Sequence, residues 1–242
     1  MDDTTFSATA AARNTMVDCQ VRPNKVTDPR VLDAMRALPR ELFVPPGVAA
    51  IAYVDQDIPL GRGRVLMQPM VIARMVQLSR ALPGERALVV GGGTGYGAAL
   101  LAACGAVVTV LEEDAELRAM AAVLLPRFAP HASLVAGSLT DVAPGGPWDL
   151  ILIEGAIPAI PPAFAGQLAD GGRLVTILTG EAGMRSGLVQ RGLLGQAVLA
   201  EPVPSAAPRR LSARVVFDCS TSSLPGFGLA PAFAFADSPF AG

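Results

Sequence analysis

The chain has 242 residues, of which 51% are hydrophobic, and a formal net charge of −2. With this charge, no overall basic field argues for binding to nucleic acid. The length fits one large domain or one domain with appendages. The longest apolar run, residues 98–111, is interrupted by Gly105 and Thr109 and is too short to span a bilayer. We expect a sizeable core, and neither a nucleic-acid nor a membrane partner.

Cysteine and histidine usage bounds the chemistry further. Cys19, Cys104 and Cys219 are odd in number and far apart, and His131 is the single histidine. This pattern is neither a disulfide framework nor a metal-ligand spacing. Free cysteines and a polar, acidic N-terminus that lacks a secretory signal favour the cytoplasm. We therefore predict a cytoplasmic protein without a metal site.

Residues 1–82 are predicted to form a helical cap with a loop on the substrate side. Residues 1–12 are small and polar and are expected to be frayed. Asp28 and Pro29 mark a helix start, and apolar residues at helical spacing follow until Pro39 ends the helix. Residues 55–69 hold glycines and prolines without a period, which favours a functional loop. Residues 71–82 read as a helix that leads into the core.

The strongest local signal lies at residues 87–101. An apolar run at 87–90 suits a buried strand, and residues 96–104 are rich in alanine and leucine, as in a helix. The turn between them consists of Gly91, Gly92, Gly93, Thr94 and Gly95. Glycines let a ligand approach the backbone, and the start of a helix offers unpaired N–H groups to it. A plain tight turn between strand and helix is the alternative.

An acidic residue follows the glycine turn at a distance that is typical of nucleotide-binding βαβ units. The β-branched run 107–111 ends in Glu112, Glu113 and Asp114, and Glu112 lies about twenty residues beyond Gly93. In a nucleotide-binding βαβ unit, an acid at that place binds the ribose hydroxyls. Acids also suit the first turn of a solvated helix. Both readings hold together if Glu112 is the ligand and the next two acids start the helix.

The remaining pattern predicts a doubly wound, mostly parallel α/β sheet over residues 83–183. Strands are expected at 87–90, 107–111, 133–136, 149–153 and 173–178, and helices at 96–104, 114–125 and 161–169. Residues 184–242 are predicted to add short antiparallel strands at 188–191, 196–199 and 214–217. The tail after them carries Phe227, Phe233 and Phe235, and we expect it to wrap the body, since three free aromatic rings would be exposed to water. The three parts form one compact domain.

Several of these stretches resemble the protein-L-isoaspartate O-methyltransferases, S-adenosylmethionine-dependent enzymes with the class I methyltransferase (Rossmann-like) fold. The matching stretches are residues 16–22, 28–35, 39–45, 52–55, 58–61, 68–69, 91–99 and 161–174. The resemblance implies S-adenosylmethionine as cofactor and, as acceptor, a protein or peptide with an altered aspartyl residue. It also implies a monomer or homodimer. Cofactor-binding roles fall on the glycine turn 91–95, Glu112, Glu113 and the turn Gly137-Ser138-Leu139.

The chain departs from the family pattern on the substrate side. Met67 stands where the family has the serine regarded as its active-site residue, and Val65 stands where it has threonine. The Gly-Asp-Gly turn whose acid holds the adenine amino group is Gly137-Ser138-Leu139 here. Glu154 stands where the family has small residues. The cofactor-side signature therefore survives while the substrate-side hydroxyls are absent.

Methyl transfer to a carboxylate needs no general base, because the carboxylate is already ionised at neutral pH. It needs alignment and a dry pocket. Arg64 is a candidate to hold the acceptor carboxylate bidentately, with a solvated loop arginine as the alternative. Met67 is expected to act as an apolar filler at the catalytic position. Glu154, at the carboxyl end of a strand, would favour a cationic group such as the sulfonium or the methionine amine, or else cap the next turn.

Three functions stay open at this level. The first is a methyltransferase of the isoaspartyl repair type, and the second is a methyltransferase with another acceptor. The third is a non-catalytic S-adenosylmethionine-binding or scaffold protein. A Rossmann dehydrogenase fits less well, because no group for hydride transfer stands out. The family-wide N-terminal stretches favour the first function, and the missing hydroxyls favour the other two.

Overall fold

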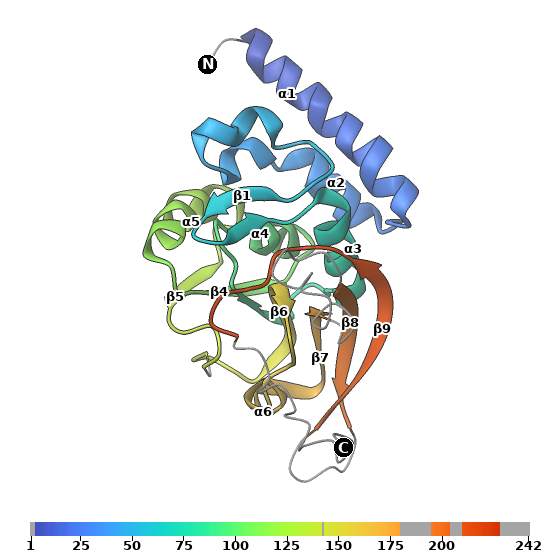
Figure 1. The fold of residues 1–242 in the computed structure, drawn as a ribbon, viewed down its shortest axis with the longest axis vertical. Helices are drawn as coiled ribbons and strands as arrows, with labels where there is room; N and C mark the ends of the chain where they lie inside the picture. Colours follow the sequence, from blue (N-terminus) through green and yellow to red (C-terminus); the bar gives the residue numbers. More distant parts are fainter. Residues whose placement is uncertain (1–2, 142, 180–194, 204–209, 228–242) are drawn as a thin grey trace, which may run out of the picture.

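The computed structural model describes residues 3–141, 143–179, 195–203 and 210–227. Its centre is a seven-stranded sheet in the order β5-β4-β3-β6-β7-β8-β9 (Figure 1). The strands are β3 (Arg86–Val90), β4 (Val107–Glu112), β5 (Ser133–Ala136), β6 (Trp148–Ile157), β7 (Leu168–Thr179), β8 (Gly195–Pro202) and β9 (Leu211–Cys219). The first five strands in that order pair in parallel, whereas β8 and β9 are antiparallel. The predicted α/β sheet with an antiparallel extension is confirmed; the expected strand at 188–191 lies outside the described residues.

The order of the strands creates one crevice at the carboxyl end of the sheet. The chain moves outward from β3 through β4 to β5 and then returns to β6 on the other side of β3. Val90 pairs with Ile153, so the glycine turn after β3 lies beside Glu154 and Gly155 of β6. Open α/β sheets bind ligands at such a switch point, because the connections leave its two strands toward opposite faces.

Helices cover the two faces unequally. The apolar side chains of α3 (Pro69–Ser79), α4 (Tyr96–Ala103) and α5 (Ala115–Phe128) share one core cluster with the N-terminal cap. The other face holds α6 (Ala163–Gln167), whose Phe164 is fully buried. The helix expected at 161–169 is shorter than predicted, because Leu168 is buried and already pairs with Trp148 as the start of β7.

The cap corrects two predictions. Residues 3–16 form helix α1 and are not frayed; its alanine-rich sequence has high helix propensity, and buried Met16 anchors its end. The stretch 55–69 contains a hairpin of β1 (Ile58–Gly61) and β2 (Arg64–Leu66). Its two-residue turn has positive φ at both Arg62 (52°) and Gly63 (73°), a geometry that sequence rules expect mainly from Asn-Gly or Asp-Gly. The predicted helix start at Asp28 is confirmed, since Asp28 caps α2 (Pro29–Ala37).

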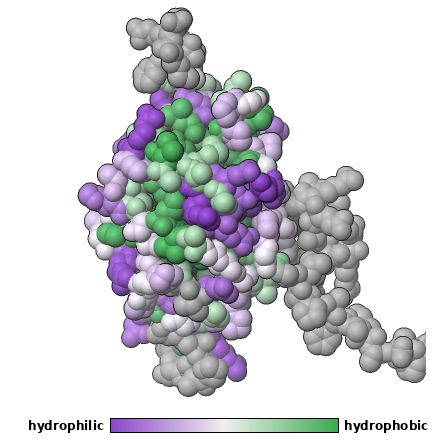
Figure 2. All heavy atoms as spheres, turned by 90° about the vertical axis from the view of Figure 1, so that its left-hand side faces the viewer, coloured by the Kyte–Doolittle hydropathy of each residue, from purple (hydrophilic) through white to green (hydrophobic). Residues whose placement is uncertain are grey.

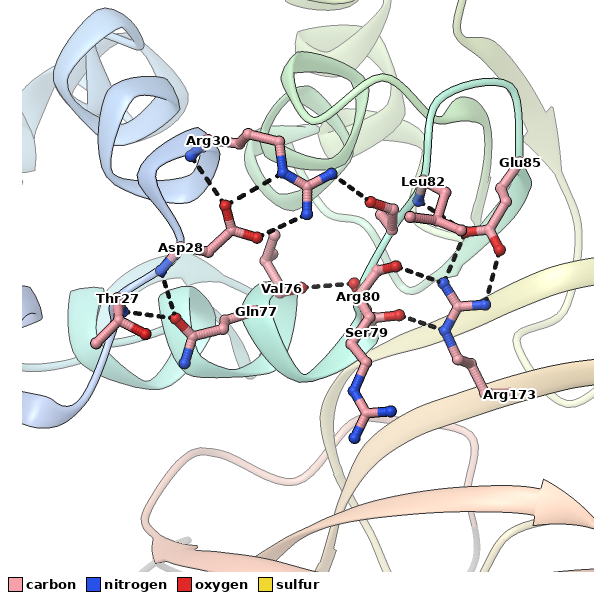
Figure 3. Close-up of polar contacts among 11 residues, drawn as sticks. Thr27, Asp28, Arg30, Val76, Gln77, Ser79, Arg80, Leu82, Glu85 and Arg173 are labelled. Atoms are coloured by element: carbon pink, nitrogen blue, oxygen red, sulfur yellow. Dashed lines mark hydrogen bonds and ion pairs between the residues drawn. The ribbon is translucent and has the colours of Figure 1, made fainter.

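A polar network fastens the cap to the core on the side of α3 shown in Figure 3. Arg30 of α2 pairs with Asp28 at 2.7 Å and donates to the carbonyl of Ala81 at 2.7 Å. Arg173 of β7 binds both carboxylate oxygens of Glu85, at 3.0 and 2.6 Å, and donates to the last carbonyls of α3. These contacts satisfy carbonyls that the end of α3 leaves without helical partners, and they hold the cap in place over the sheet.

The surface on the α5 and β5 side mixes hydrophobic and hydrophilic residues (Figure 2). Val123 of α5 is 67% exposed, as suits an outward position on a surface helix. Among the described residues, none of the helices has the length and apolar character needed to cross a membrane.

Candidate active site

The glycine turn after β3 is a buried left-handed loop. Gly91, Gly93 and Gly95 have φ angles of +68°, +55° and +95°, which side-chain-bearing residues rarely adopt. Gly95 donates to the carbonyl of Gly92 at 2.8 Å, and α4 begins at the next residue, Tyr96. The turn therefore directs the free N–H groups at the start of α4 toward the crevice.

Glu112 is the last residue of β4 and is 0% exposed. Its carboxylate accepts the backbone N–H of Gly93 at 2.8 Å and that of Asp114 at 3.0 Å. Asp114 in turn caps α5 by accepting from the backbone of Glu116 and Leu117. The expected division between a ligand acid and a helix start is therefore compatible with the structure, and the carboxylate of Glu112 lies directly beneath the glycine turn.

Arg64 fills the remaining acceptor positions of that carboxylate. From β2, its Nη1 lies 2.9 Å from Oε1 of Glu112 and its Nη2 lies 3.1 Å from Oε2. Nη2 also donates to the carbonyl of Gly91 at 2.5 Å. Arg64 is 6% exposed, so it is not a solvated loop arginine. The residue expected on the acceptor side thus reaches into the predicted ribose site.

Met67 lies in a buried wall supported by an arginine that sequence reasoning missed. Arg40 is 0% exposed, lies over the ring of Tyr96, and donates to the carbonyl of Met67 at 2.5 Å. Burial lowers the pKa of Arg40 from its ordinary value. Met67 itself is 3% exposed, as its expected role of apolar filler requires. The only sequence signal for Arg40 was its place inside the family-like stretch 39–45.

Glu154 lies on β6 at a bulge between Leu152 and Ala156. Its carboxylate lies against Gly97 of α4, where an added Cβ would be 2.0 Å from Oε1. Oε1 is buried and has no hydrogen-bond partner among the described residues, so the carboxylate is not a turn cap. Burial raises the pKa of Glu154 to about 8; the Arg64 charge opposes this shift and the Glu112 charge adds to it. Burial therefore disfavours the charged form of this carboxyl group, and a cationic partner beside it would favour the ionised form.

The other predicted positions are more peripheral or structural. The Thr94 hydroxyl donates to the carbonyl of Phe43 at 2.6 Å, and Leu139 is buried in the core of the second face. Ser138 is exposed and its hydroxyl lies 3.0 Å from that of Thr140, while Glu113 is exposed. The structure thus brings together the glycine turn, Glu112, Glu154 and Arg64. Within the described ranges, no three His, Cys, Asp or Glu side chains are grouped as metal ligands, and the three cysteines are free.

Comparison with known proteins shows the family of the chain. The family model for protein-L-isoaspartate(D-aspartate) O-methyltransferase matches residues 11–186, more than half of the chain. The chain belongs to this family. A protein-L-isoaspartate O-methyltransferase of Koribacter versatilis (strain Ellin345) is 40% identical over 168 residues, covering 69% of this chain and 76% of the relative. One from Methylorubrum extorquens (strain PA1) is 41% identical over 167 residues, covering 69% and 73%.

Solved structures share the fold of this isoaspartyl methyltransferase family member. A protein-L-isoaspartate O-methyltransferase structure superposes with a TM-score of 0.69 at 19% identity, covering 89% of this chain and 67% of its own. A Plasmodium falciparum protein of that name, in complex with S-adenosyl-L-homocysteine, gives 0.68 at 18% identity, covering 88% and 98%. At these identities the likeness shows the fold alone, whereas the family assignment comes from the sequence relatives. The chain is an S-adenosylmethionine-dependent methyltransferase of this family.

The geometry of the described residues also suits this cofactor. The positive-φ glycines form a cradle that a Cβ would fill, since one at Gly91 would lie 2.9 Å from Leu224 and 3.2 Å from Arg64. Glu112, the acid predicted to bind the ribose, is buried at the end of β4, and the unpartnered Oε1 of Glu154 lies across the switch point. These groups suit a ligand that has hydroxyls and a positive charge. In the structure as described, the chain's own Arg64 occupies the hydrogen-bonding positions of Glu112.

Proposed function

We propose that this protein methylates the carboxylate of an altered aspartyl residue in a protein or peptide. The observation that carries the proposal is the bidentate contact of the Arg64 guanidinium, buried beside Gly91, with a carboxylate. A guanidinium that already binds one carboxylate in the crevice with two hydrogen bonds can bind the acceptor's carboxylate in the same way. The lost family hydroxyls at positions 65 and 67 are thereby replaced by a charged donor.

The cofactor supplies a methyl group on a positively charged sulfur, which a carboxylate takes by direct displacement. The residues of the chain hold and align the reactants. We assign the glycine turn and Glu112 to the cofactor, with Glu112 accepting from the ribose hydroxyls. Because Glu112 already accepts bonds from Arg64 and two backbone N–H groups, the ribose takes its place only when Arg64 leaves. The freed guanidinium is then available to the acceptor.

Charge balance supports this exchange. While Arg64 contacts Glu112, the buried carboxylate is neutralised. When Arg64 moves away, Glu112 would be left as an unpaired buried charge, which is costly. A cofactor with a positive sulfonium compensates that charge, and Glu154, assigned to the same cofactor, lies close enough to Glu112 for their charges to interact. Glu113 and the 137–139 turn are assigned to the rim of the cofactor site.

The acceptor side is built to exclude water. Met67 and Leu66 are buried, and Arg40 fixes the Met67 carbonyl. A dry pocket strengthens the contact between the guanidinium and the acceptor carboxylate. No proton has to be removed from a carboxylate, so the absence of a histidine or serine from this wall does not prevent the reaction.

The test is methyl transfer to a matched pair of peptides, one with an isoaspartyl residue and one with the same sequence and a normal aspartyl residue. We expect a methyl ester on the isoaspartyl peptide alone, formed more slowly than by a family member that keeps the hydroxyls. Ester formation on neither peptide by a protein that binds the cofactor would contradict the proposal.

A second candidate is methyl transfer to another acceptor. It is favoured by Glu154, because an ionised carboxylate at this buried position would repel an anionic acceptor and attract a cationic one. Methylation of an amine or hydroxyl compound, with no ester on the isoaspartyl peptide, would select it. We propose a monomer or a homodimer, as the family resemblance implies. We place the protein in the cytoplasm, where its free cysteines stay reduced.

A further inference from the structure

The chain that follows β9 runs across the carboxyl end of the sheet. In Figure 1 it leaves the top of β9 and crosses toward β4, between the sheet and the β1–β2 hairpin. We call residues 221–227 the strap. It pairs with β6 through two backbone hydrogen bonds, from Ala156 to the carbonyl of Ser222 at 3.1 Å and from Leu224 to the carbonyl of Ala156 at 2.8 Å. The strap is therefore fixed to the strand that forms one side of the crevice.

Leu224 lies in the crevice itself. Its side chain is 4% exposed. A Cβ added at Gly91 would lie 2.9 Å from its Cδ1, and one added at Gly155 would lie 2.9 Å from its Cβ. Gly91 follows β3 and Gly155 belongs to β6, so Leu224 touches the backbone on both sides of the switch point. An apolar side chain thus covers the glycine that a ligand must approach.

Leu224 and Arg64 close the same place from two sides. An added Cβ at Gly91 would meet both of them, Leu224 at 2.9 Å and the Arg64 guanidinium at 3.2 Å. Arg64 takes the acceptor positions of Glu112, and Leu224 takes the apolar contact over the turn. The space over Gly91 and the acceptor atoms of Glu112 are therefore occupied by the chain's own side chains.

Asp57 joins the strap to the segment that follows the β1–β2 hairpin. One carboxylate oxygen accepts the Thr221 hydroxyl at 2.8 Å and the N–H of Ser222 at 3.3 Å. The other accepts the N–H of Gln68, next to Met67, at 2.8 Å. At the far end of the strap, Phe227 stacks on Phe164 with ring centroids 6.5 Å apart. The strap is thus held at both ends, and its first anchor also holds the acceptor-side segment.

The strap lies outside the part of the chain that the family accounts for. The family model ends at residue 186. The closing contact is therefore carried by sequence that the family assignment does not explain.

We infer that the strap is a built-in competitor of the cofactor, with Leu224 occupying the crevice until S-adenosylmethionine or S-adenosylhomocysteine displaces it. The inference rests on the cofactor site alone and not on the identity of the acceptor. A protein whose competent state is only partly populated shows an affinity reduced by that fraction. Weakening the strap should therefore tighten cofactor binding.

Calorimetric titration of S-adenosylhomocysteine into Leu224→Ala tests this inference. Trimming a buried leucine to alanine should favour the open state, and we expect about 5- to 30-fold tighter binding than in the wild type. Leu211→Ala is the matched control, because Leu211 packs against the same core cluster from β9, away from the glycine turn. Its affinity should equal that of the wild type. Weaker or unchanged binding by Leu224→Ala would overturn the inference, since weaker binding would make Leu224 a wall of the occupied site.

Hydrogen exchange of the wild-type protein supplies a second readout, which needs no substitution. The amides of Ala156 and Leu224 are hydrogen-bonded across the strap. On addition of S-adenosylhomocysteine we expect both amides to exchange faster, because the strap is displaced. Slower exchange of these amides in the complex would show that the strap closes over the cofactor and would refute competition.

Discussion

Arg64 and Glu112 are 48 residues apart in the sequence and form a bidentate ion pair between side chains that are 5% and 0% exposed. The pair joins the β1–β2 hairpin to the end of β4 directly beneath the glycine turn. It links the residue proposed for the acceptor to the residue proposed for the cofactor. Arg64 is therefore free to bind the acceptor only when the cofactor has taken its place at Glu112.

Arg64→Ala separates these two roles. The variant should bind S-adenosylhomocysteine about tenfold more tightly or better, because the ribose no longer competes with a guanidinium. It should unfold more easily, by about 3 kcal/mol, because Glu112 loses its buried partner. Methyl transfer to the isoaspartyl peptide should fall. Titration calorimetry, denaturant unfolding and initial rates measure the three effects.

Arg64→Lys is the control for charge, since lysine keeps the charge and loses the bidentate fork. We expect it to restore part of the stability and little of the turnover. Weaker cofactor binding by Arg64→Ala would mean that Arg64 contacts the cofactor and would refute the exchange.

Gly93→Val tests the glycine turn. Gly93 has φ +55°, and a Cβ there would lie 3.4 Å from Leu60, so valine would be strained and would narrow the crevice. We expect S-adenosylhomocysteine binding to be abolished while the circular dichroism spectrum stays native.

Gly84→Val is the matched control for strain. Gly84 also has a positive φ (+82°), but nothing lies within 4 Å of an added Cβ there. It should lose stability, on the order of 1–2 kcal/mol, and keep its cofactor affinity. Equal S-adenosylhomocysteine affinity of the two variants would show that the glycine turn only connects strand and helix and does not bind the ligand.

Glu154→Gln tests the buried carboxyl group through pH. The pKa of Glu154 is raised to about 8, so its contribution to stability is present at low pH and is lost as the pH rises toward and through 8. Glutamine stays neutral throughout. The free energy of unfolding of Glu154→Gln minus that of the wild type should therefore increase from pH 5 to pH 9, by on the order of 2–4 kcal/mol.

Glu113→Gln, at the exposed acid that follows Glu112 in the sequence, is the control for this series. Urea unfolding at several pH values measures both variants. A difference for Glu154→Gln that stays constant with pH would show that the carboxyl group is ionised in the folded protein.

Restoring the family hydroxyls tests the acceptor wall. In Val65→Thr with Met67→Ser, each new hydroxyl that reaches the acceptor should speed methylation of the isoaspartyl peptide about two- to twelvefold. Met67→Leu keeps the volume without a hydroxyl and should leave the rate unchanged. A double variant no faster than the wild type would show that Arg64 already suffices to orient the carboxylate.

Most of the sheet could be predicted because its strands are continuous apolar runs separated by clear breaks, as at 87–90 and 107–111. The hairpin could not, because Arg62 adopts a left-handed turn without the usual residue signal. Glu112 could be selected as a candidate from its distance to the glycine turn, but its ion pair with Arg64 depends on how a distant hairpin packs. The position of Leu224 was likewise beyond local patterns, since only the tertiary fold sets it over Gly91.

The most direct test of the account is calorimetric titration of S-adenosylhomocysteine into Arg64→Ala and into the double variant Arg64→Ala with Glu112→Ala. The shared background removes the unpaired arginine that Glu112→Ala alone would leave. We predict one-site binding to the single variant and a loss of about 1.5–3 kcal/mol of binding free energy when Glu112 is also removed, the worth of a hydrogen bond to a charged group. Equal affinity of the two variants, or no binding by the single one, would contradict the assignment of Glu112 to the ribose.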